Sequence, residues 1–401
     1  MTDTSYPGSR AGWRTGRSIG LAAALVLLAF IAGCGGGVGS GGTGTYAAGP
    51  ITGFGSIIVG GVHYDDSAAT VLDDDDVARS RSELRLGMTV AIDSDAIRSD
   101  GGQRSATASR VRIGSELVGP VTAIDAAAGL FTVLGQTVRM AVDTVFDERL
   151  TGGLRGLTVG RTVEVFAFYD AANERYDATR IEPRVAPAAF VVRGPVASLD
   201  SGARTLRIGR ATYAYDGAAN LPAGLAVGQV VRLRLALAPD AQGRYVVASF
   251  GTGQYLPEDR EGAELEGLVT AYDSSASFQV NGLPVDSSSA NFPDGTAGLG
   301  LGVRVEVKGA LRDGVLRAST VELESDASID DRGFEFEGRI SAVDAPAQTF
   351  VVGSQVISWA RPDLRLDNGT LTDLVVGRSV EVRAQLNADR TRVEATRITF
   401  R

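Results

Sequence analysis

The chain has 401 residues and a formal net charge of −9 at pH 7. An acidic protein repels phosphate backbones, so we expect no nucleic-acid partner. The sequence contains one cysteine, Cys34, and one histidine, His63. This count argues against disulfides, His/Cys zinc sites, and Cys–His or Ser–His–Asp catalysis, and we expect no cofactor.

The first 33 residues have the pattern of a signal peptide and are excluded from the fold. Arg10, Arg14 and Arg17 precede an apolar stretch at residues 19–31, which is shorter than the roughly 20 residues that a membrane-spanning helix needs. Small residues then lead to Cys34, in a sequence that resembles the lipobox of bacterial lipoproteins. Cys34 is therefore the predicted lipid attachment site; an ordinary secretory signal with an incidental cysteine is the alternative.

Lipidation at Cys34 predicts attachment to a membrane, because several acyl chains hold a protein durably whereas one chain gives only marginal affinity. The next residue is Gly35, not the aspartate that resembles an inner-membrane retention signal. We therefore expect a cell-envelope protein, an outer-membrane lipoprotein that faces the periplasm or the cell surface. Residues 34–48 are Gly-rich and are typical of a flexible tether.

One motif occurs five times in the rest of the chain. Its copies begin at Gly49, Gly119, Gly194, Gly267 and Gly338, with spacings of 70, 75, 73 and 71 residues. A unit of about 70 residues is just large enough to enclose its own core. We define five repeats by these positions: repeat 1 (49–115), repeat 2 (116–186), repeat 3 (187–256), repeat 4 (257–328) and repeat 5 (329–401).

Repeat 4 has the clearest pattern of strands. Residues 266–273 form the first strand, and residues 278–280 alternate apolar and polar side chains before Asn281-Gly282. Asn-Gly is a strong hairpin signal, because both central residues of a type I′ turn need positive φ. Valines alternate with charged residues at 303–307, and a last strand follows at 316–323. The other copies repeat this order, which predicts five strands in each unit.

Long helical patterns are missing and Gly, Val and Thr are plentiful, so the sequence predicts an all-β fold. Closing each five-stranded sheet into a barrel removes its exposed edges. We predict five tandem small barrels, with an OB-like topology as the first choice and an SH3-like barrel as the second. A short helix is expected in connections such as residues 143–160. Neighbouring repeats are expected to pack end to end, each around its own apolar interior.

These motifs resemble a bacterial family known as domain of unknown function 5666. The resemblance is carried by GPITGFGSIIVGGVHYD at residues 49–65, by the Leu-x-Leu-Gly-Met-x-Val sequence at residues 84–90, and by the repeated Gly-x-Val…Asp and Leu-x-Val-Gly elements. It extends over nearly all of residues 49–400, with repeat 1 as the most divergent copy. The resemblance implies secreted or lipidated proteins with tandem copies, and it supplies no catalytic or binding residues.

Two features of repeat 1 could carry chemistry. His63 lies in the third predicted strand, where a lone histidine is more often a surface or barrel-rim residue than a catalyst. Asp73, Asp74, Asp75 and Asp76 form an acidic insertion whose oxygens could bind a hard cation such as calcium. Their spacing is not that of an EF-hand, and a charged run in a loop is usually only solvated.

Three recurring glutamates raise the question of a glycosidase, which uses paired carboxylates. Glu164, Glu306 and Glu381 occupy equivalent places in the fourth strand of their repeats. Recurrence favours the solvent side of a duplicated fold over one unique active site, so we predict no catalytic residues. The sequence favours a non-enzymatic, lipid-anchored spacer or binding scaffold with an envelope protein or glycan as partner. The alternative is a hydrolase of envelope polysaccharide or peptidoglycan.

Overall fold

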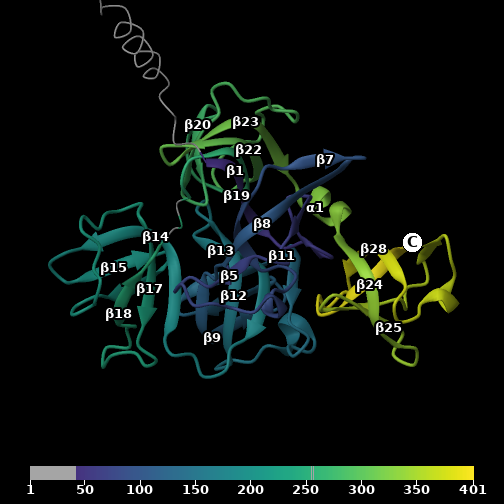
Figure 1. The fold of residues 1–401 in the computed structure, drawn as a ribbon. Helices are drawn as coiled ribbons and strands as arrows, with labels where there is room; N and C mark the ends of the chain where they lie inside the picture. Colours follow the sequence, from purple (N-terminus) through teal and green to yellow (C-terminus); the bar gives the residue numbers. More distant parts are fainter. Residues whose placement is uncertain (1–41, 254, 256) are drawn as a thin grey trace, which may run out of the picture. The chain divides into compact units, whose positions relative to one another are not determined.

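The computed structural model describes residues 42–253, 255 and 257–401, and these residues fold almost entirely into β-strands (Figure 1). The strands fall into five successive groups that correspond to the five repeats. The all-β prediction is therefore confirmed. Cys34 and the signal peptide lie outside the described residues, so lipidation stays a prediction.

Repeat 2 shows the complete circuit of strands. Its strands are β9 (Leu117–Asp125), β10 (Leu130–Val133), β11 (Gln136–Phe146), β12 (Thr162–Asp170) and β13 (Arg175–Pro183). Antiparallel pairing joins β9 to β10, β10 to β11, β13 to β12 and β12 to β9, while β11 and β13 pair in parallel. The circuit closes into a five-stranded barrel with the third strand beside the fifth, which is the OB-like order.

Repeats 4 and 5 close in the same way. The strands of repeat 4 are β19 (Arg260–Ser274), β20 (Ser277–Val280), β21 (Leu283–Asp286), β22 (Arg304–Arg312) and β23 (Val315–Glu324). Those of repeat 5 are β24 (Phe334–Asp344), β25 (Thr349–Val352), β26 (Gln355–Ser358), β27 (Arg365–Asp367), β28 (Ser379–Leu386) and β29 (Val393–Phe400). The parallel contacts are β21–β23 in repeat 4, and β26–β29 and β27–β29 in repeat 5.

Repeats 1 and 3 vary this plan. In repeat 1 the first strand is split, and the strands are β1 (Gly42–Pro50), β2 (Gly53–Phe54), β3 (Ile57–Val59), β4 (Val62–Asp65), β5 (Thr70–Leu72), β6 (Thr89–Ser94), β7 (Arg98–Asp100) and β8 (Gln103–Ile113). Because β1 begins at Gly42, the end of the predicted tether is strand. Repeat 3 contains β14 (Phe190–Asp200), β15 (Thr205–Ile208), β16 (Ala211–Ala214), β17 (Val230–Leu235) and β18 (Val247–Gly251). Its third strand meets the fifth-strand region only through an isolated bridge between Ala214 and Val246.

The turns have the backbone geometry that their sequences demand. Asn281 and Gly282 both have positive φ, 48° and 81°, as a type I′ hairpin requires. The motif aspartates Asp125, Asp200 and Asp344 each accept a hydrogen bond from the backbone N–H three residues later, at 2.8–3.0 Å. Their recurrence is thus explained by turn formation.

Helical structure is scarce in the described residues. The expected short helix between the third and fourth strands of repeat 2 is a 3₁₀ turn, η2 (Gly153–Gly156). The α-helix α1 (Asp326–Arg332) lies between repeats 4 and 5 instead, where we expected no helix. Ser325 caps its first turn by accepting a hydrogen bond from the backbone N–H of Ser328.

The repeats are not packed end to end in chain order. Strand β1 of repeat 1 pairs in parallel with β19 of repeat 4, and β2 pairs in parallel with β24 of repeat 5. Between repeats 2 and 3, β9 pairs with β14. Backbone pairing thus joins repeat 1 to two repeats that do not follow it in the chain. The end-to-end expectation was wrong because sequence order does not determine which barrel edges meet.

The apolar interiors are also partly shared. Buried residues of repeats 1 and 5, with Val145 and Phe166 of repeat 2, form one cluster. Those of repeats 2 and 3 form a second, and repeat 4 has its own cluster joined by Tyr46 of repeat 1. The expectation of a private interior for every module therefore fails for four of the repeats. Contiguous apolar contact across the boundaries couples the stability of one barrel to that of its neighbours.

Candidate functional site

The acidic loop of repeat 1, residues 73–76, lies against arginines of repeats 1 and 3. Every aspartate in it has an arginine partner: Asp73–Arg79 at 2.8 Å, Asp74–Arg193 at 2.5 Å, Asp75–Arg232 at 2.7 Å, Asp75–Arg234 at 2.9 Å and Asp76–Arg112 at 2.8 Å. The loop therefore joins repeat 1 to repeat 3 through charge-assisted hydrogen bonds.

This pairing changes the interpretation of the acidic run. Burial opposes the charge of Asp75, but Arg232 and Arg234 hold its pKa below the ordinary value. Guanidinium groups therefore occupy the oxygens that a cation would need. Within the described ranges, no group of three or more His, Cys, Asp or Glu residues is arranged to hold a metal ion. The acidic loop is explained by contact between repeats.

A cleft of about 740 Å³ opens beside the acidic loop. Residues of repeats 1, 2, 3 and 4 form its walls, and they combine aromatic, aliphatic and charged side chains: Tyr46, Phe168, Tyr169, Arg193, Val227 and Gln279. Clefts of roughly 300–1,000 Å³ with mostly apolar walls and a few polar groups are typical of ligand sites. Because separate repeats build the walls, the cleft exists only while they stay packed.

Glu116 is the most perturbed carboxyl group in this cleft. It lies just before β9, and its Oε1 accepts a hydrogen bond from Arg193 at 3.4 Å. Burial raises the pKa of Glu116 to about 7; Arg193 lowers it and the nearby Asp74 carboxylate raises it further. A carboxyl group that exchanges its proton near neutral pH can act as a hydrogen-bond donor or as a general acid.

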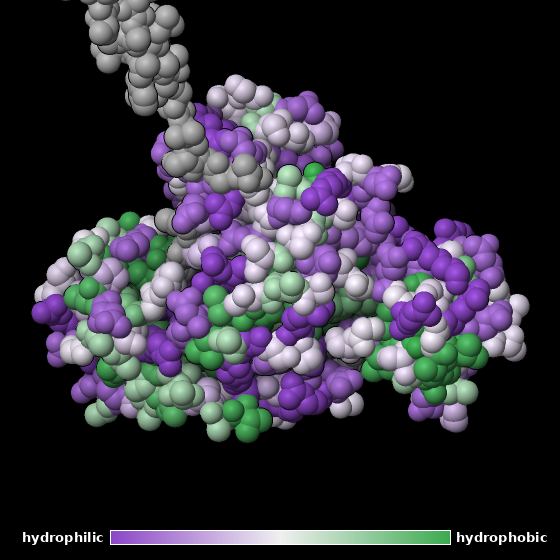
Figure 2. All heavy atoms as spheres, viewed as in Figure 1, coloured by the Kyte–Doolittle hydropathy of each residue, from purple (hydrophilic) through white to green (hydrophobic). Residues whose placement is uncertain are grey.

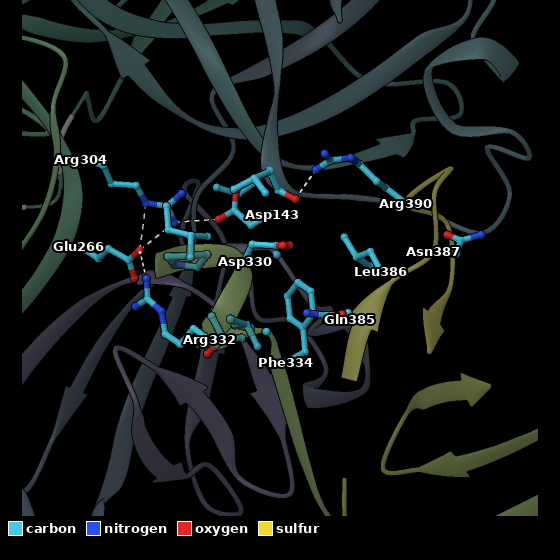
Figure 3. Close-up of a pocket in the computed structure, with 18 of the residues that line it drawn as sticks. Asp143, Glu266, Arg304, Asp330, Arg332, Phe334, Gln385, Leu386, Asn387 and Arg390 are labelled. Carbon is cyan, nitrogen blue, oxygen red and sulfur yellow. Dashed lines mark hydrogen bonds and ion pairs between the residues drawn. The ribbon is translucent and has the colours of Figure 1, made fainter. Parts of the chain in front are cut away.

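A second, smaller cavity of about 230 Å³ lies where repeats 1, 2, 4 and 5 meet (Figure 3). On one side, a chain of ion pairs joins four of its elements, β11, β19, β22 and α1. Arg304 contacts Asp143 at 2.8 Å and Glu266 at 2.8 Å, and Arg332 of α1 lies 3.7 Å from Glu266. Burial opposes the charge of Arg304, but Asp143 and Glu266 outweigh it and raise its pKa. Both carboxylates on this side of the cavity are paired with Arg304, although Asp143 Oδ1 and Glu266 Oε2 are buried without a hydrogen-bond partner.

The other side of the junction cavity is less well matched. Arg390, in the loop between β28 and β29, donates from Nη1 to the carbonyl oxygens of Ala141 and Val142. No carboxylate in the described part of the chain lies within ion-pair distance of it, and burial lowers the pKa of Arg390. Asp330 also lines the cavity. Its side chain extends from α1 toward the side on which Leu386 lies (Figure 3).

His63 lies in β4, the third strand of repeat 1, as expected. Its Nε2 is 3.7 Å from Glu335 of repeat 5, and its Nδ1 is 3.2 Å from the amide of Gln103. The side chain is 12% exposed and lines neither cavity. His63 therefore contributes to a contact between repeats 1 and 5.

The recurring glutamates do not share a solvent-exposed face. The side chains of Glu164, Glu306 and Glu381 are 15%, 8% and 27% exposed. Repeat 1 covers Glu306, and a Cβ on Gly60 would lie 3.2 Å from its Oε1. The prediction of a solvent side was wrong for Glu306 because another repeat packs on the outer surface of the barrel.

Sequence reasoning missed Glu116, Arg193, Asp330 and Arg390, the charged groups that stand out in the two cavities. Glu116 did have a signal in the sequence, because Glu264 of repeat 4 and Glu335 of repeat 5 stand at the equivalent place, three residues before the motif glycine. Arg193, Asp330 and Arg390 do not belong to a recurring motif. The partners of Glu116, Arg193 and Arg390 come from other repeats, which an inspection of one unit cannot reveal.

Comparison with known proteins gives a family but no activity. Four segments, residues 48–111, 118–182, 266–322 and 337–399, match a family described as a domain of unknown function (DUF5666), and together they span more than half of the chain. Repeat 3 is the copy without a match, so the expectation that repeat 1 diverges most was wrong. No curated protein matches the chain. Among the described residues, no helix is both long and apolar enough to span a bilayer.

One solved structure is similar in part. It is described as a multidomain protein with nucleic acid binding domains from Streptococcus pneumoniae, is 17% identical, and the match covers 58% of this chain and 76% of that one. The TM-score is 0.15. A score this low establishes no common overall arrangement, and we transfer no property from that protein.

Proposed function

Because the chain belongs to the DUF5666 family, whose description names no activity, we propose a function from its own residues: a lipid-anchored protein of the cell envelope that acts as a non-enzymatic binding scaffold. The five modules form one unit, and the cleft of about 740 Å³ between four of them is the proposed ligand surface. An envelope protein or a glycan is the proposed partner.

The observation that carries this proposal is the construction of the cleft. Ion pairs of the acidic loop fix repeat 1 against repeat 3, and paired strands fix repeat 1 against repeat 4. The packing of the repeats thereby holds the aromatic and aliphatic side chains of the cleft in place, so a ligand can bind without a large rearrangement of the repeats. A rigid scaffold that holds a recognition surface in this way lowers the entropic cost of binding.

Photocrosslinking in intact cells tests the binding surface. A photoreactive amino acid at Tyr169 lies in the cleft, and the matched control is the same amino acid at Leu237, which is 52% exposed and outside the cavities. We expect a discrete adduct from position 169 and none from position 237. Equal labelling from the two positions contradicts the cleft as the partner surface.

The location is tested separately through Cys34. Cys34→Ala removes the lipid attachment site, and we expect the protein to move from the membrane fraction to the soluble fraction. Cys34→Ser is a second variant that keeps the size of the side chain. Unchanged membrane association of both variants contradicts the lipid anchor and leaves the cleft experiment unaffected.

Glu116 supports a second candidate function, a hydrolase of envelope polysaccharide or peptidoglycan. A carboxyl group with a pKa of about 7 in the cleft of about 740 Å³ has the protonation behaviour of a general acid. Purified protein incubated with peptidoglycan or envelope polysaccharide tests this function. Release of soluble fragments that Glu116→Gln abolishes and Glu164→Gln preserves would rank the hydrolase above the scaffold.

A further inference from the structure

The junction cavity of Figure 3 has two charged groups, Arg390 and Asp330, that form no ion pair within the described residues. The guanidinium of Arg390 is held in place by two backbone carbonyl oxygens. Carbonyl oxygens fix its orientation but do not neutralise it, which agrees with its lowered pKa. Arg304 in the same cavity has two carboxylates and a raised pKa. The Arg390 guanidinium is therefore held in place by hydrogen bonds but has no carboxylate at ion-pair distance.

Asp330 supplies the opposite charge. It lies on α1 and lines the same cavity. Within the described residues, its carboxylate makes no hydrogen bond or ion pair to another side chain, although its charge acts on Arg390 at longer range. Arg332 of the same helix is already paired with Glu324 at 2.9 Å. The cavity thus offers one positioned cation, Arg390, and one exposed anion, Asp330, that form no ion pair with each other.

Apolar side chains form part of the cavity wall, beside the polar side chains of Gln385 and Asn387. Phe334 and Ile329 are buried, with 8% and 7% exposure, and Ile51 is fully buried. Leu386 completes this surface (Figure 3). A volume of about 230 Å³ exceeds the roughly 150 Å³ of an engineered cavity that holds a benzene molecule. The space therefore suits a compact molecule somewhat larger than benzene.

We propose that the junction cavity is a binding site for a free α-amino acid with an apolar side chain of leucine or phenylalanine size. The ligand carboxylate pairs with Arg390, its ammonium group pairs with Asp330, and its side chain packs against Phe334 and Leu386. The opposite charges of a zwitterion match the two unpaired groups, and neither a simple amine nor a simple acid satisfies both. This inference does not rest on the envelope location or on the cleft.

Calorimetric titration of the full chain, purified in detergent, tests the ligand class. L-leucine and L-phenylalanine are compared with 4-methylpentanoate, which lacks the ammonium group, and 3-methylbutylamine, which lacks the carboxylate. We expect the amino acids to bind and each analogue to bind about ten to one hundred times more weakly, because one charge-assisted contact is lost. Equal binding of an analogue, or no heat from either amino acid up to about 10 mM, overturns the proposal.

Two variants on the same helix test the position of the site. Asp330→Asn removes the proposed ammonium partner, whereas Asp331→Asn changes the neighbouring residue, which is exposed and does not line the cavity. We expect at least a tenfold loss of affinity for Asp330→Asn and no change for Asp331→Asn. Equal effects of the two variants place the ligand elsewhere and overturn the proposal.

Arg390→Gln tests the carboxylate partner and needs a control for folding, because Arg390 also joins repeat 5 to repeat 2. Its affinity is measured only if its melting temperature stays near that of the parent chain. We expect the variant to lose affinity for leucine and to keep the weak affinity for 3-methylbutylamine. Asp330 is exposed and makes no hydrogen bond or ion pair to another side chain, so we expect Asp330→Asn to fold. If Arg390→Gln fails to fold, the affinity of Asp330→Asn for leucine decides whether the cavity is the binding site.

Discussion

Repeats 4 and 5 carry glutamates at the same places of the same strands, but the two sets lie in different surroundings. The equivalent pairs are Glu264 and Glu335, Glu266 and Glu337, and Glu306 and Glu381. In repeat 4 the side chains are 12%, 2% and 8% exposed; in repeat 5 they are 25%, 31% and 27% exposed. The same sequence position is buried in one module and partly solvated in the other.

The cause is the module that covers each face. Strand β1 of repeat 1 pairs with β19 along five positions, whereas β2 pairs with β24 at only two. The β3–β4 hairpin carries Gly60 over Glu306. In repeat 5, Arg401 pairs with Glu337 and Glu381 at the surface. Duplication therefore copies the inner face of a barrel faithfully, while the chemistry of its outer face depends on its neighbours.

The largest loss of stability is expected when the buried cation Arg304 of repeat 4 is removed. Arg304→Met leaves Glu266 and Asp143 buried without their shared guanidinium, and breaking a buried ion pair in this way costs about 3–5 kcal/mol. Arg401→Met is the control on the solvated side, where Arg401 is 49% exposed and the cost is below about 1 kcal/mol. Urea denaturation of both variants measures the difference.

A triple variant sharpens this comparison. Adding Glu266→Gln and Asp143→Asn to Arg304→Met removes the orphaned charges, and we expect most of the lost stability to return. No recovery means that Arg304 acts mainly through its contact with the Phe168 ring, at 5.2 Å. Equal losses for Arg304→Met and Arg401→Met would refute the link between burial and electrostatic cost.

The next largest loss of stability is expected at the Leu-x-Val-Gly turn. This turn recurs in the repeats, but its surroundings differ between repeat 1 and repeat 5. Leu86 in repeat 1 is 1% exposed, while its equivalent Val376 in repeat 5 is 66% exposed. Repeat 2 covers the first turn, since Arg180 donates to the Leu86 carbonyl oxygen at 3.2 Å. Leu86→Ala should cost about 2–5 kcal/mol, and Val376→Ala less than about 0.5 kcal/mol. Thermal denaturation distinguishes the two, and similar losses would contradict the contact.

The inner faces of the barrels could be predicted from sequence because their physical causes are local. Alternating valines such as Val305 and Val307 predict buried strand faces, and Asn281-Gly282 predicts a hairpin whatever lies outside it. The contacts of Asp73–Asp76 could not be predicted. Their arginines lie up to 159 positions away, as for Asp75 and Arg234, and a single sequence has no local signal for such pairs. The two cavities were missed for the same reason, since residues of several repeats build each of them.

The smallest of the three effects concerns Glu306 and pH. Burial is the main cause that raises the pKa of Glu306 to about 7; Lys308 lowers it, and Glu266, Glu264 and Glu322 raise it further. The folded protein therefore binds a proton that the unfolded chain releases near pH 4.5. The free energy of unfolding falls as pH rises from about 4.5 to about 7 and is level above that range. Glu116 also has a raised pKa, so it too makes the free energy of unfolding fall as pH rises through this range.

Glu306→Gln keeps the shape of the side chain and removes its charge, so it should stabilise the protein only where wild-type Glu306 is ionised. We expect a gain of about 2–3 kcal/mol near pH 8 and below about 1 kcal/mol near pH 5. Glu381→Gln, at the equivalent place in repeat 5, should change the difference between the two pH values by less than about 1 kcal/mol. Urea denaturation measures the change in the free energy of unfolding for each of the two variants at each of the two pH values. A Glu306→Gln gain that is the same at both pH values would show that packing against repeat 1, and not the buried charge, distinguishes the two repeats.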